Sequence, residues 1–163
     1  MTTEITLSQR AADIMSSPAI TVTQTATLSD AARTMVRKNI GALPVVDDND
    51  EFAGMLTERI LQAKLASIRP ASSLSPENRV ILELFELNPL GSTDLERAFA
   101  AARRAAVADA MIPNPATVSE SMPVWEVSKA MLDSHASHIA VLRDRRVVGV
   151  ISRHDLMKAY LER

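Results

Sequence analysis

A helical period marks the hydrophobic residues that follow Thr27. Their spacing of three and four positions predicts a helix that buries one face. These positions are Leu28, Ala31, Ala32, Met35 and Val36. Thr27 and Asp30 stand three residues apart at the start of the stretch, which is the spacing of a capping box. The sequence therefore predicts a capped amphipathic helix that begins at Leu28.

Extended patterns surround this helix. The run 19–22, bounded by Pro18, predicts a short strand, and the runs 42–46 and 52–57 predict two longer strands. The polar residues 47–50 between the longer runs predict a hairpin turn. The expected order is strand, helix, strand, strand, with a second helix closing the unit.

The same pattern returns later in the chain. Met111 repeats Met15 at an offset of 96, and Gly149 repeats Gly54 at an offset of 95. Strands are expected at 139–142 and 147–151, with a turn at 143–146 and a closing helix from Ser152 to about Leu161. A unit used twice typically packs about a pseudo-two-fold axis and forms clefts along it. We therefore expect an α+β fold of two βαββα repeats.

A helical insert is expected between the two copies. Residues 77–87 predict one helix that ends at Asn88-Pro89, and residues 92–94 predict the cap of a second helix that runs through Ala105. The expected divisions are 1–62 for the N-terminal segment and first repeat, 63–106 for the insert, and 107–163 for the second repeat. The apolar stripe of the insert is interpreted as packing on the molecule, with a docking surface for a partner protein as the alternative.

Composition narrows the classes of function. Of the 163 residues 47% are hydrophobic, enough for a full core, and a formal net charge of -2 disfavours nucleic acid. The lack of cysteine excludes disulfides and thiolate chemistry. Four glycines leave no glycine-rich phosphate loop, and no catalytic constellation indicates an enzyme. The N-terminus has no signal pattern and no apolar run approaches about 20 residues, so a cytoplasmic protein without a membrane span is expected.

Several short motifs occur twice in the same order. Ala12-Asp13-Ile14-Met15 is matched by Ala108-Asp109-Ala110-Met111, and Gly54-Met55-Leu56-Thr57 by Gly149-Val150-Ile151-Ser152; Asn39 to Asp47 adds to the pattern. Together they resemble a pair of CBS domains (a Bateman module) over 11–61 and 107–161. The resemblance implies a regulatory homodimer that needs no cofactor. It also implies that an adenosyl ligand, either AMP, ADP, ATP or an S-adenosyl compound, binds between the repeats.

The motif that ends the second copy carries the candidate chemistry. Ser152 ends a strand and opens a helix, so free N–H groups and a hydroxyl there suit a phosphate. Asp155 presents a carboxylate that can accept from ribose hydroxyls. The same spacing also forms a capping box, which needs no ligand. In the first copy Ile60 stands in place of the aspartate, so one competent site is predicted rather than two.

The resemblance implies that the first copy completes the Asp155 cleft. The residues carried over are Ala19, Ile20, Ile40, Gly41 and Ala42. His138 is interpreted as pointing toward a phosphate and His154 as lying beside it in the first helical turn, each with a ligand-free surface position as the alternative. His135 aligns with Asn39 and indicates a turn. The three histidines lack the carboxylate spacing of a metal site, so no metal is expected. The alternative function is a ligand-free scaffold or interaction module that uses the helices of 77–106.

Overall fold

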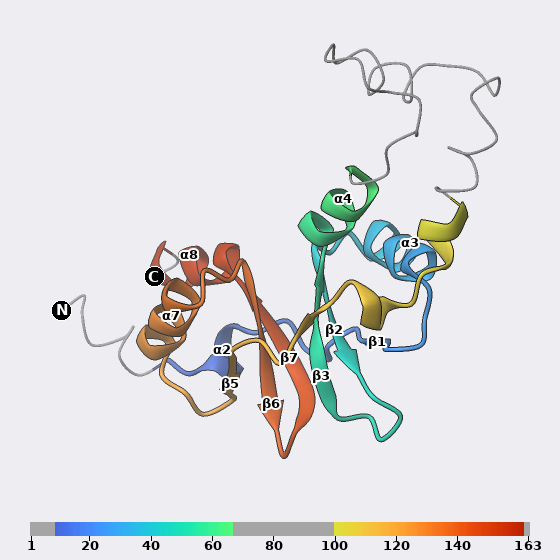
Figure 1. Ribbon diagram of the computed structural model, residues 1–163. Helices are drawn as coiled ribbons and strands as arrows, with labels where there is room; N and C mark the ends of the chain where they lie inside the picture. The colour runs from blue at the N-terminus through green and yellow to red at the C-terminus, as the bar shows by residue number, and fades with distance from the viewer. Residues whose placement is uncertain (1–8, 67–99, 162–163) are drawn as a thin grey trace, which may run out of the picture.

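The structure is a computed structural model that describes residues 9–66 and 100–161 (Figure 1). The first half contains α2 (Ala11–Ile14), β1 (Val22–Thr23), α3 (Leu28–Lys38), β2 (Ala42–Val46), β3 (Phe52–Thr57) and α4 (Glu58–Ala66). The second half contains the 3-10 helix η1 (Val107–Asp109), β4 (Ile112–Pro113), β5 (Thr117–Ser119), α7 (Val124–Asp133), β6 (His138–Arg143), β7 (Arg146–Ser152) and α8 (Arg153–Leu161). The predicted α+β fold with two βαββα repeats is confirmed.

The strands form two sheets with helices on their outer faces. One sheet has the order β1-β2-β3-β4 and the other the order β5-β6-β7. In each sheet a parallel pair is followed by an antiparallel hairpin with a register shift near its turn. Helices α3 and α4 lie beside the first sheet and α7 and α8 beside the second, so the sheets face each other at the middle of the molecule (Figure 1).

Alternate residues along each strand belong to different hydrophobic clusters. Along β6, Ile139 and Val141 pack against the helices of the second repeat. Ala140 points to the opposite face, where it joins Ala42 and Met55 of the first repeat. Because successive side chains of a strand face opposite sides, one strand supports both its own core and the contact between repeats.

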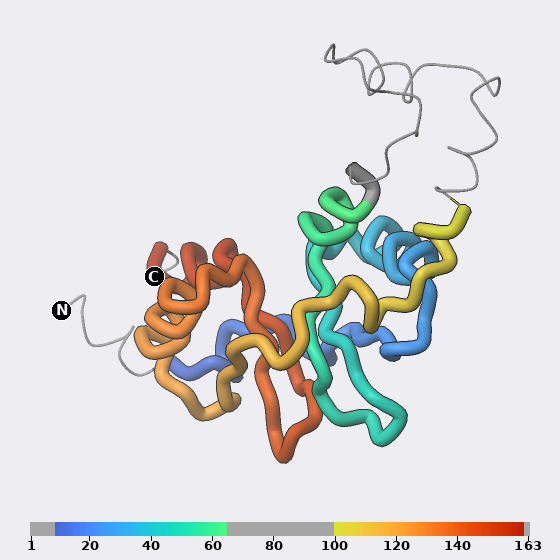
Figure 2. Tube along the Cα trace, viewed as in Figure 1, coloured from blue at the N-terminus to red at the C-terminus, as the bar shows by residue number. Residues whose placement is uncertain are grey.

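The segment that leads into each repeat docks on the other repeat. Ala11 N–H donates to Met122 O at 2.8 Å, and at the matching position of the second copy Val107 N–H donates to Ala26 O at 2.8 Å. Figure 2 shows both crossings, with the blue segment against the orange half and the gold segment against the blue half. Ala11 and Val107 are fully buried in these positions. Each core is therefore completed by a residue of the other copy.

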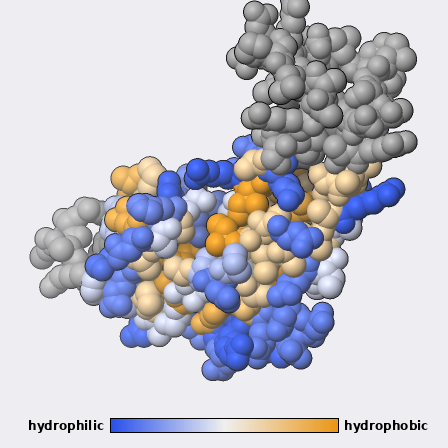
Figure 3. Space-filling view, viewed as in Figure 1, coloured by the Kyte–Doolittle hydropathy of each residue, from blue (hydrophilic) through white to orange (hydrophobic). Residues whose placement is uncertain are grey.

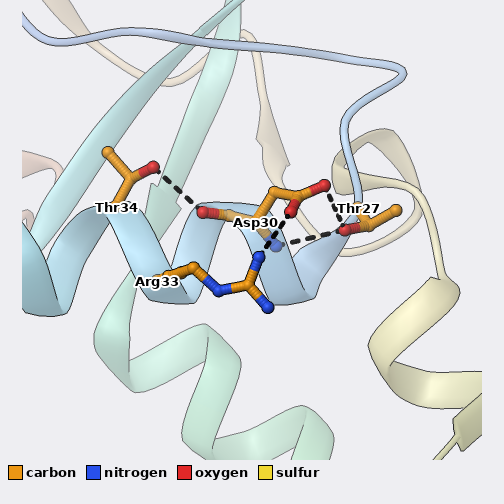
Figure 4. A network of polar contacts seen from close by, with 4 residues as sticks. All are labelled: Thr27, Asp30, Arg33 and Thr34. Atoms are coloured by element: carbon orange, nitrogen blue, oxygen red, sulfur yellow. Dashed lines mark hydrogen bonds and ion pairs between the residues drawn. The ribbon is translucent and has the colours of Figure 1, made fainter.

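Helix α3 begins at the predicted cap. Thr27 Oγ1 donates to Asp30 Oδ2 at 2.8 Å and accepts from Asp30 N–H at 3.1 Å (Figure 4). Leu28 and Met35 are buried as expected. The expectation that Val36 shares this face is wrong, since its side chain is 82% exposed. Val36 lies about 100° around the helix from Met35, which places it at the edge of the stripe.

The strand predicted at 19–22 is shorter than expected. β1 contains Val22 and Thr23 alone, which pair with Val45 and Val46. Ala19 and Ile20 precede the strand and line a pocket instead. Residues 19–21 therefore precede the strand and take no part in its pairing with β2.

The two hairpin turns lie side by side and carry opposite charge. Arg145 and Arg146 of the second repeat form ion pairs with Glu51 at 2.8 Å and Asp50 at 2.9 Å. Asp144 and Arg145 have positive φ angles of 49° and 68°, as a two-residue hairpin turn requires. Figure 3 shows hydrophilic side chains over this end and hydrophobic ones along the junction above it. Because three of the four paired side chains are exposed and Glu51 is half-buried, these contacts add little stability.

Part of the predicted insert falls within the described ranges. Residues 100–104 are helical, which agrees with the second predicted helix. The helix predicted at 77–87 and the start of the second one lie outside the described residues. No helix in the described part of the chain has the length and apolarity needed to cross a membrane.

Candidate functional site

A closed hydrogen-bond network joins the end of β7 to the start of α8. The N–H and hydroxyl of Ser152 donate to Asp155 Oδ2 at 2.8 and 2.7 Å, and Asp155 N–H donates back to Ser152 Oγ at 3.2 Å. This is the capping box that the spacing allowed. No residue in the described ranges donates to Asp155 Oδ1. The carboxylate therefore caps the helix and keeps one oxygen for another donor.

The amide groups at the start of α8 are less available than the sequence suggested. Ser152 and Asp155 use theirs within the box, and Arg153 N–H donates to Ser137 O at 3.1 Å. The expectation that free N–H groups await a phosphate is wrong for these three residues. The capping box and the carbonyl of Ser137, in the loop before β6, already accept the hydrogen bonds of these three amides.

A pocket of about 230 Å³ opens beside this junction. Eight of the nine residues predicted for the site line it: Ala19, Ile20, Ile40, Gly41, Ala42, His138, Ser152 and Asp155. The first five come from the first repeat and the last three from the second. Both repeats therefore supply walls of one cleft, and we call it the Asp155 cleft.

The three histidines occupy separate positions. His138 lines the Asp155 cleft, whereas His154 is exposed and does not line it. His154 precedes Asp155 by one residue in α8, so the helical period turns its side chain about 100° away. His135 has a φ of 53° and matches Asn39, with a φ of 52°, which confirms its turn role. Among the described residues no three His, Asp or Glu side chains gather to hold a metal.

Four further residues complete the lining and were not selected from the sequence. They are Ser16, Pro18, Asn39 and Val150. Ser16 forms an isolated bridge with Val150 across the repeats, a pairing with no local sequence signal. Asn39 carries a usable signal, because asparagine tolerates the left-handed conformation that ends α3 there.

His138 lies near two acidic side chains and one basic side chain. Its Nδ1 is 3.0 Å from Ser137 Oγ. Burial lowers the pKa of His138 below its usual value, with a smaller contribution from Arg153 in the same direction. The carboxylates of Glu58 and Asp155 act in the opposite direction without reversing the shift. The lowered pKa favours the neutral form of the imidazole.

Glu58 is a neighbour of the cleft that sequence reasoning missed. A Cβ atom built on Gly41 would lie 3.4 Å from Glu58 Cδ and 3.4 Å from His138 Cε1. Glu58 N–H also donates to Gly41 O at 2.9 Å. In the sequence Glu58 is a first-turn acid of α4, a common helix-stabilising position, and nothing local points to Gly41 or His138.

The matching junction of the first repeat lacks half of this network. Ile60 N–H donates to Thr57 Oγ1 at 3.3 Å, as Asp155 N–H does to Ser152 Oγ. The Ile60 side chain packs against the core of the first repeat and returns no hydrogen bond. This junction offers a hydroxyl and no carboxylate.

The fold and cleft define a pair of pseudo-symmetric α+β repeats that both line one cleft. The CBS domain family matches residues 11–67 and 107–162. These matches cover more than half of the chain. The chain belongs to the CBS domain family and contains two copies of the domain.

Similar proteins span most of the chain. A CBS domain-containing protein of Dictyostelium discoideum is 28% identical over 145 residues, covering 88% of this chain and 86% of the relative. The solved structure of CBSX2 of Arabidopsis thaliana in complex with AMP has a TM-score of 0.66 at 20% identity, over 94% of this chain and 96% of that one. The CBS domain pair of protein MJ0100, in complex with 5'-methylthioadenosine and S-adenosyl-L-methionine, has a TM-score of 0.65 at 23% identity, over 93% and 95%.

Some relatives are longer enzymes. The match to L-aspartate semialdehyde sulfurtransferase of Methanocaldococcus jannaschii is 26% identical, covering 91% of this chain but 22% of the relative. A CBS pair therefore also occurs as one part of larger enzymes.

Proposed function

We propose that this CBS pair is a non-catalytic regulatory protein that binds one adenosyl compound in the Asp155 cleft. The observation that carries the proposal is the convergence of eight predicted residues from both repeats on one pocket. Two structural relatives support the ligand class, since CBSX2 was solved with AMP and MJ0100 with 5'-methylthioadenosine and S-adenosyl-L-methionine. These three ligands share adenosine.

The lining suits the parts of a nucleoside. Ala19, Ile20 and Ile40 offer apolar surface for the faces of a base. Asp155 Oδ1 is available to accept from a ribose hydroxyl, while Oδ2 holds the capping box. A volume of about 230 Å³ is below the roughly 300–1,000 Å³ of drug-sized sites.

The output of binding is conformational. The cleft walls come from both repeats, so a bound ligand contacts both at once. A ligand that fits one relative placement of the repeats better than another shifts the population toward that placement, by no more than its differential affinity. The regulated quantity is the relative orientation of the two halves.

The competing function is a scaffold in which Asp155 is a helix cap and nothing more. A matched control separates the two, because Thr27 and Asp30 form the same hydroxyl–carboxylate box at the start of α3 (Figure 4). Asp30 does not line the cleft. Loss of either cap is expected to cost about 1 kcal/mol of unfolding free energy.

The test is a thermal-shift panel of adenosine and guanosine compounds on the wild-type chain and the variants Asp155→Ala and Asp30→Ala. A sensor shows stabilisation by an adenosyl compound in the wild type and in Asp30→Ala, and none in Asp155→Ala. A scaffold shows no ligand effect in any of the three, with both variants destabilised alike. That second result would overturn the proposal.

The proposal includes a homodimer formed through the helical faces. Val36 and Leu132 occupy matching positions on α3 and α7 and are 82% and 73% exposed. Met157 and Leu161 of α8 are also exposed. A second copy would cover these side chains. Sedimentation should show a dimer that Leu132→Glu converts to a monomer, and a monomeric wild type would contradict this part.

A further inference from the structure

The Asp155 cleft lacks positive charge. Its twelve lining residues include no lysine or arginine, and Asp155 contributes a carboxylate. The neutral imidazole of His138 supplies hydrogen-bonding capacity without charge. A cleft of this composition does not attract an anion.

Two neighbouring features make the cleft less favourable for phosphate. The Glu58 carboxylate lies next to the lining residues Gly41 and His138, so it adds a second negative group near the cleft without lining it. The amides of Ser152, Arg153 and Asp155, which could have held a phosphate at the start of α8, already donate to protein acceptors.

Arg153 follows Ser152 directly in the sequence but does not line the Asp155 cleft. Arg153 occupies the position in the second repeat that Glu58 occupies in the first. Its Nε donates to Ala136 O at 3.1 Å and its Nη2 to His135 O at 3.5 Å. The guanidinium therefore lies beside the loop 135–137 that leads into His138, where it donates to backbone carbonyls, and it is not among the residues that line the Asp155 cleft.

From this distribution of charge we infer that the Asp155 cleft selects adenosyl compounds with an uncharged or cationic 5' group, such as a thioether or sulfonium, over those with phosphates. The inference rests on the proposed function and names its ligand class. Each phosphate would add negative charge beside Asp155 and Glu58 in a partly desolvated cleft, where charges interact more strongly than in water. A sulfonium in the same place is attracted by both carboxylates.

The experiment is titration calorimetry of the full chain with 5'-methylthioadenosine, S-adenosyl-L-methionine, AMP and ATP at low ionic strength. Methylthioadenosine is expected to bind at least about tenfold more tightly than AMP, with ATP weaker than AMP. S-adenosyl-L-methionine is expected to bind at least as tightly as methylthioadenosine. Added salt should narrow the difference between the charged and neutral ligands.

The variant Glu58→Lys tests whether the carboxylate of Glu58 weakens the binding of phosphate-bearing ligands. It should raise the affinity for AMP about tenfold and leave that for methylthioadenosine within about twofold. The matched control Asp109→Lys makes the same charge change at an exposed residue outside the cleft and should leave the AMP-to-methylthioadenosine ratio unchanged.

The outcomes separate this inference from the proposed function. Tighter binding of AMP or ATP than methylthioadenosine to the wild type would overturn the selectivity and leave adenosyl sensing standing. An unchanged ratio in Glu58→Lys would overturn the role of Glu58. Failure of all four compounds to bind would overturn the proposed function and this inference together.

Discussion

The two strand–helix junctions of this molecule share a backbone and differ in their side chains. Ala42 pairs with Thr57 at the end of β3, and His138 pairs with Ser152 at the end of β7. In the first turn that follows, one repeat carries Glu58 and Ile60 and the other Arg153 and Asp155. The register is repeated, whereas the charge and hydrogen-bonding groups are not.

The comparison teaches which positions the fold constrains. The buried residues between the repeats, Ala42, Met55 and Ala140, are small or apolar because they lie in a closely packed core. The first helical turn meets the cleft and solvent, so its polar residues can diverge without loss of the fold. A duplicated fold can therefore carry a site once.

The largest expected effect comes from the two glycines that each face a methionine of the other repeat. A Cβ on Gly54 would lie 2.6 Å from Ile112 O, a backbone atom, whereas the three atoms nearest to a Cβ on Gly149 all belong to the Met15 side chain. Gly54→Ala is expected to lower the unfolding free energy by about 3 kcal/mol and Gly149→Ala by about 1–2 kcal/mol. Urea denaturation measures both.

A second substitution sharpens that contrast. Met15→Ala should relieve part of the cost of Gly149→Ala, since a side chain is the obstacle. Met111→Ala should relieve less of the cost of Gly54→Ala, because it removes the contact with Met111 Sδ at 2.7 Å but leaves Ile112 O of β4, which is paired with β3. Equal rescue in both double variants would show that the two approaches are equivalent and contradict the assignment.

The sequence predicted the elements and most of the cleft for different reasons. The runs 42–46 and 52–57 became β2 and β3 with the same bounds, because strongly hydrophobic runs beside a polar turn leave few alternatives. The cleft residues came from resemblance to CBS pairs and lie together in the fold. Glu58 was missed because its neighbours Gly41 and His138 are remote in the chain.

A smaller effect is expected from Ile60→Asp, which tests whether this one residue accounts for the difference between the two strand–helix junctions. Ile60→Asp supplies the missing carboxylate beside Thr57, which can complete a capping box. Loss of apolar packing against the first core offsets the new cap, so a net destabilisation of about 1 kcal/mol is expected. Calorimetric titration with methylthioadenosine should show a second, weaker binding event per chain. A folded variant that still binds one equivalent would show that more than the carboxylate differs.

The smallest expected effect distinguishes His138 from its counterpart Ala42. The folded-state pKa of His138 lies below its usual 6.5, so the unfolded chain takes up a proton first as the pH falls. The contribution of neutral His138 to the unfolding free energy is therefore fully present above about pH 6.5. It declines below that pH until the folded-state pKa is passed. The lowered carboxyl pKa values of Asp47 and Glu120 act at more acidic pH.

Melting temperatures at pH 7.5 and 5.5 should differ less in His138→Gln than in the wild type, whereas His135→Gln, at an exposed turn, should behave as the wild type does. An equal decline in His138→Gln would show that burial of this imidazole does not govern the acid response of the cleft.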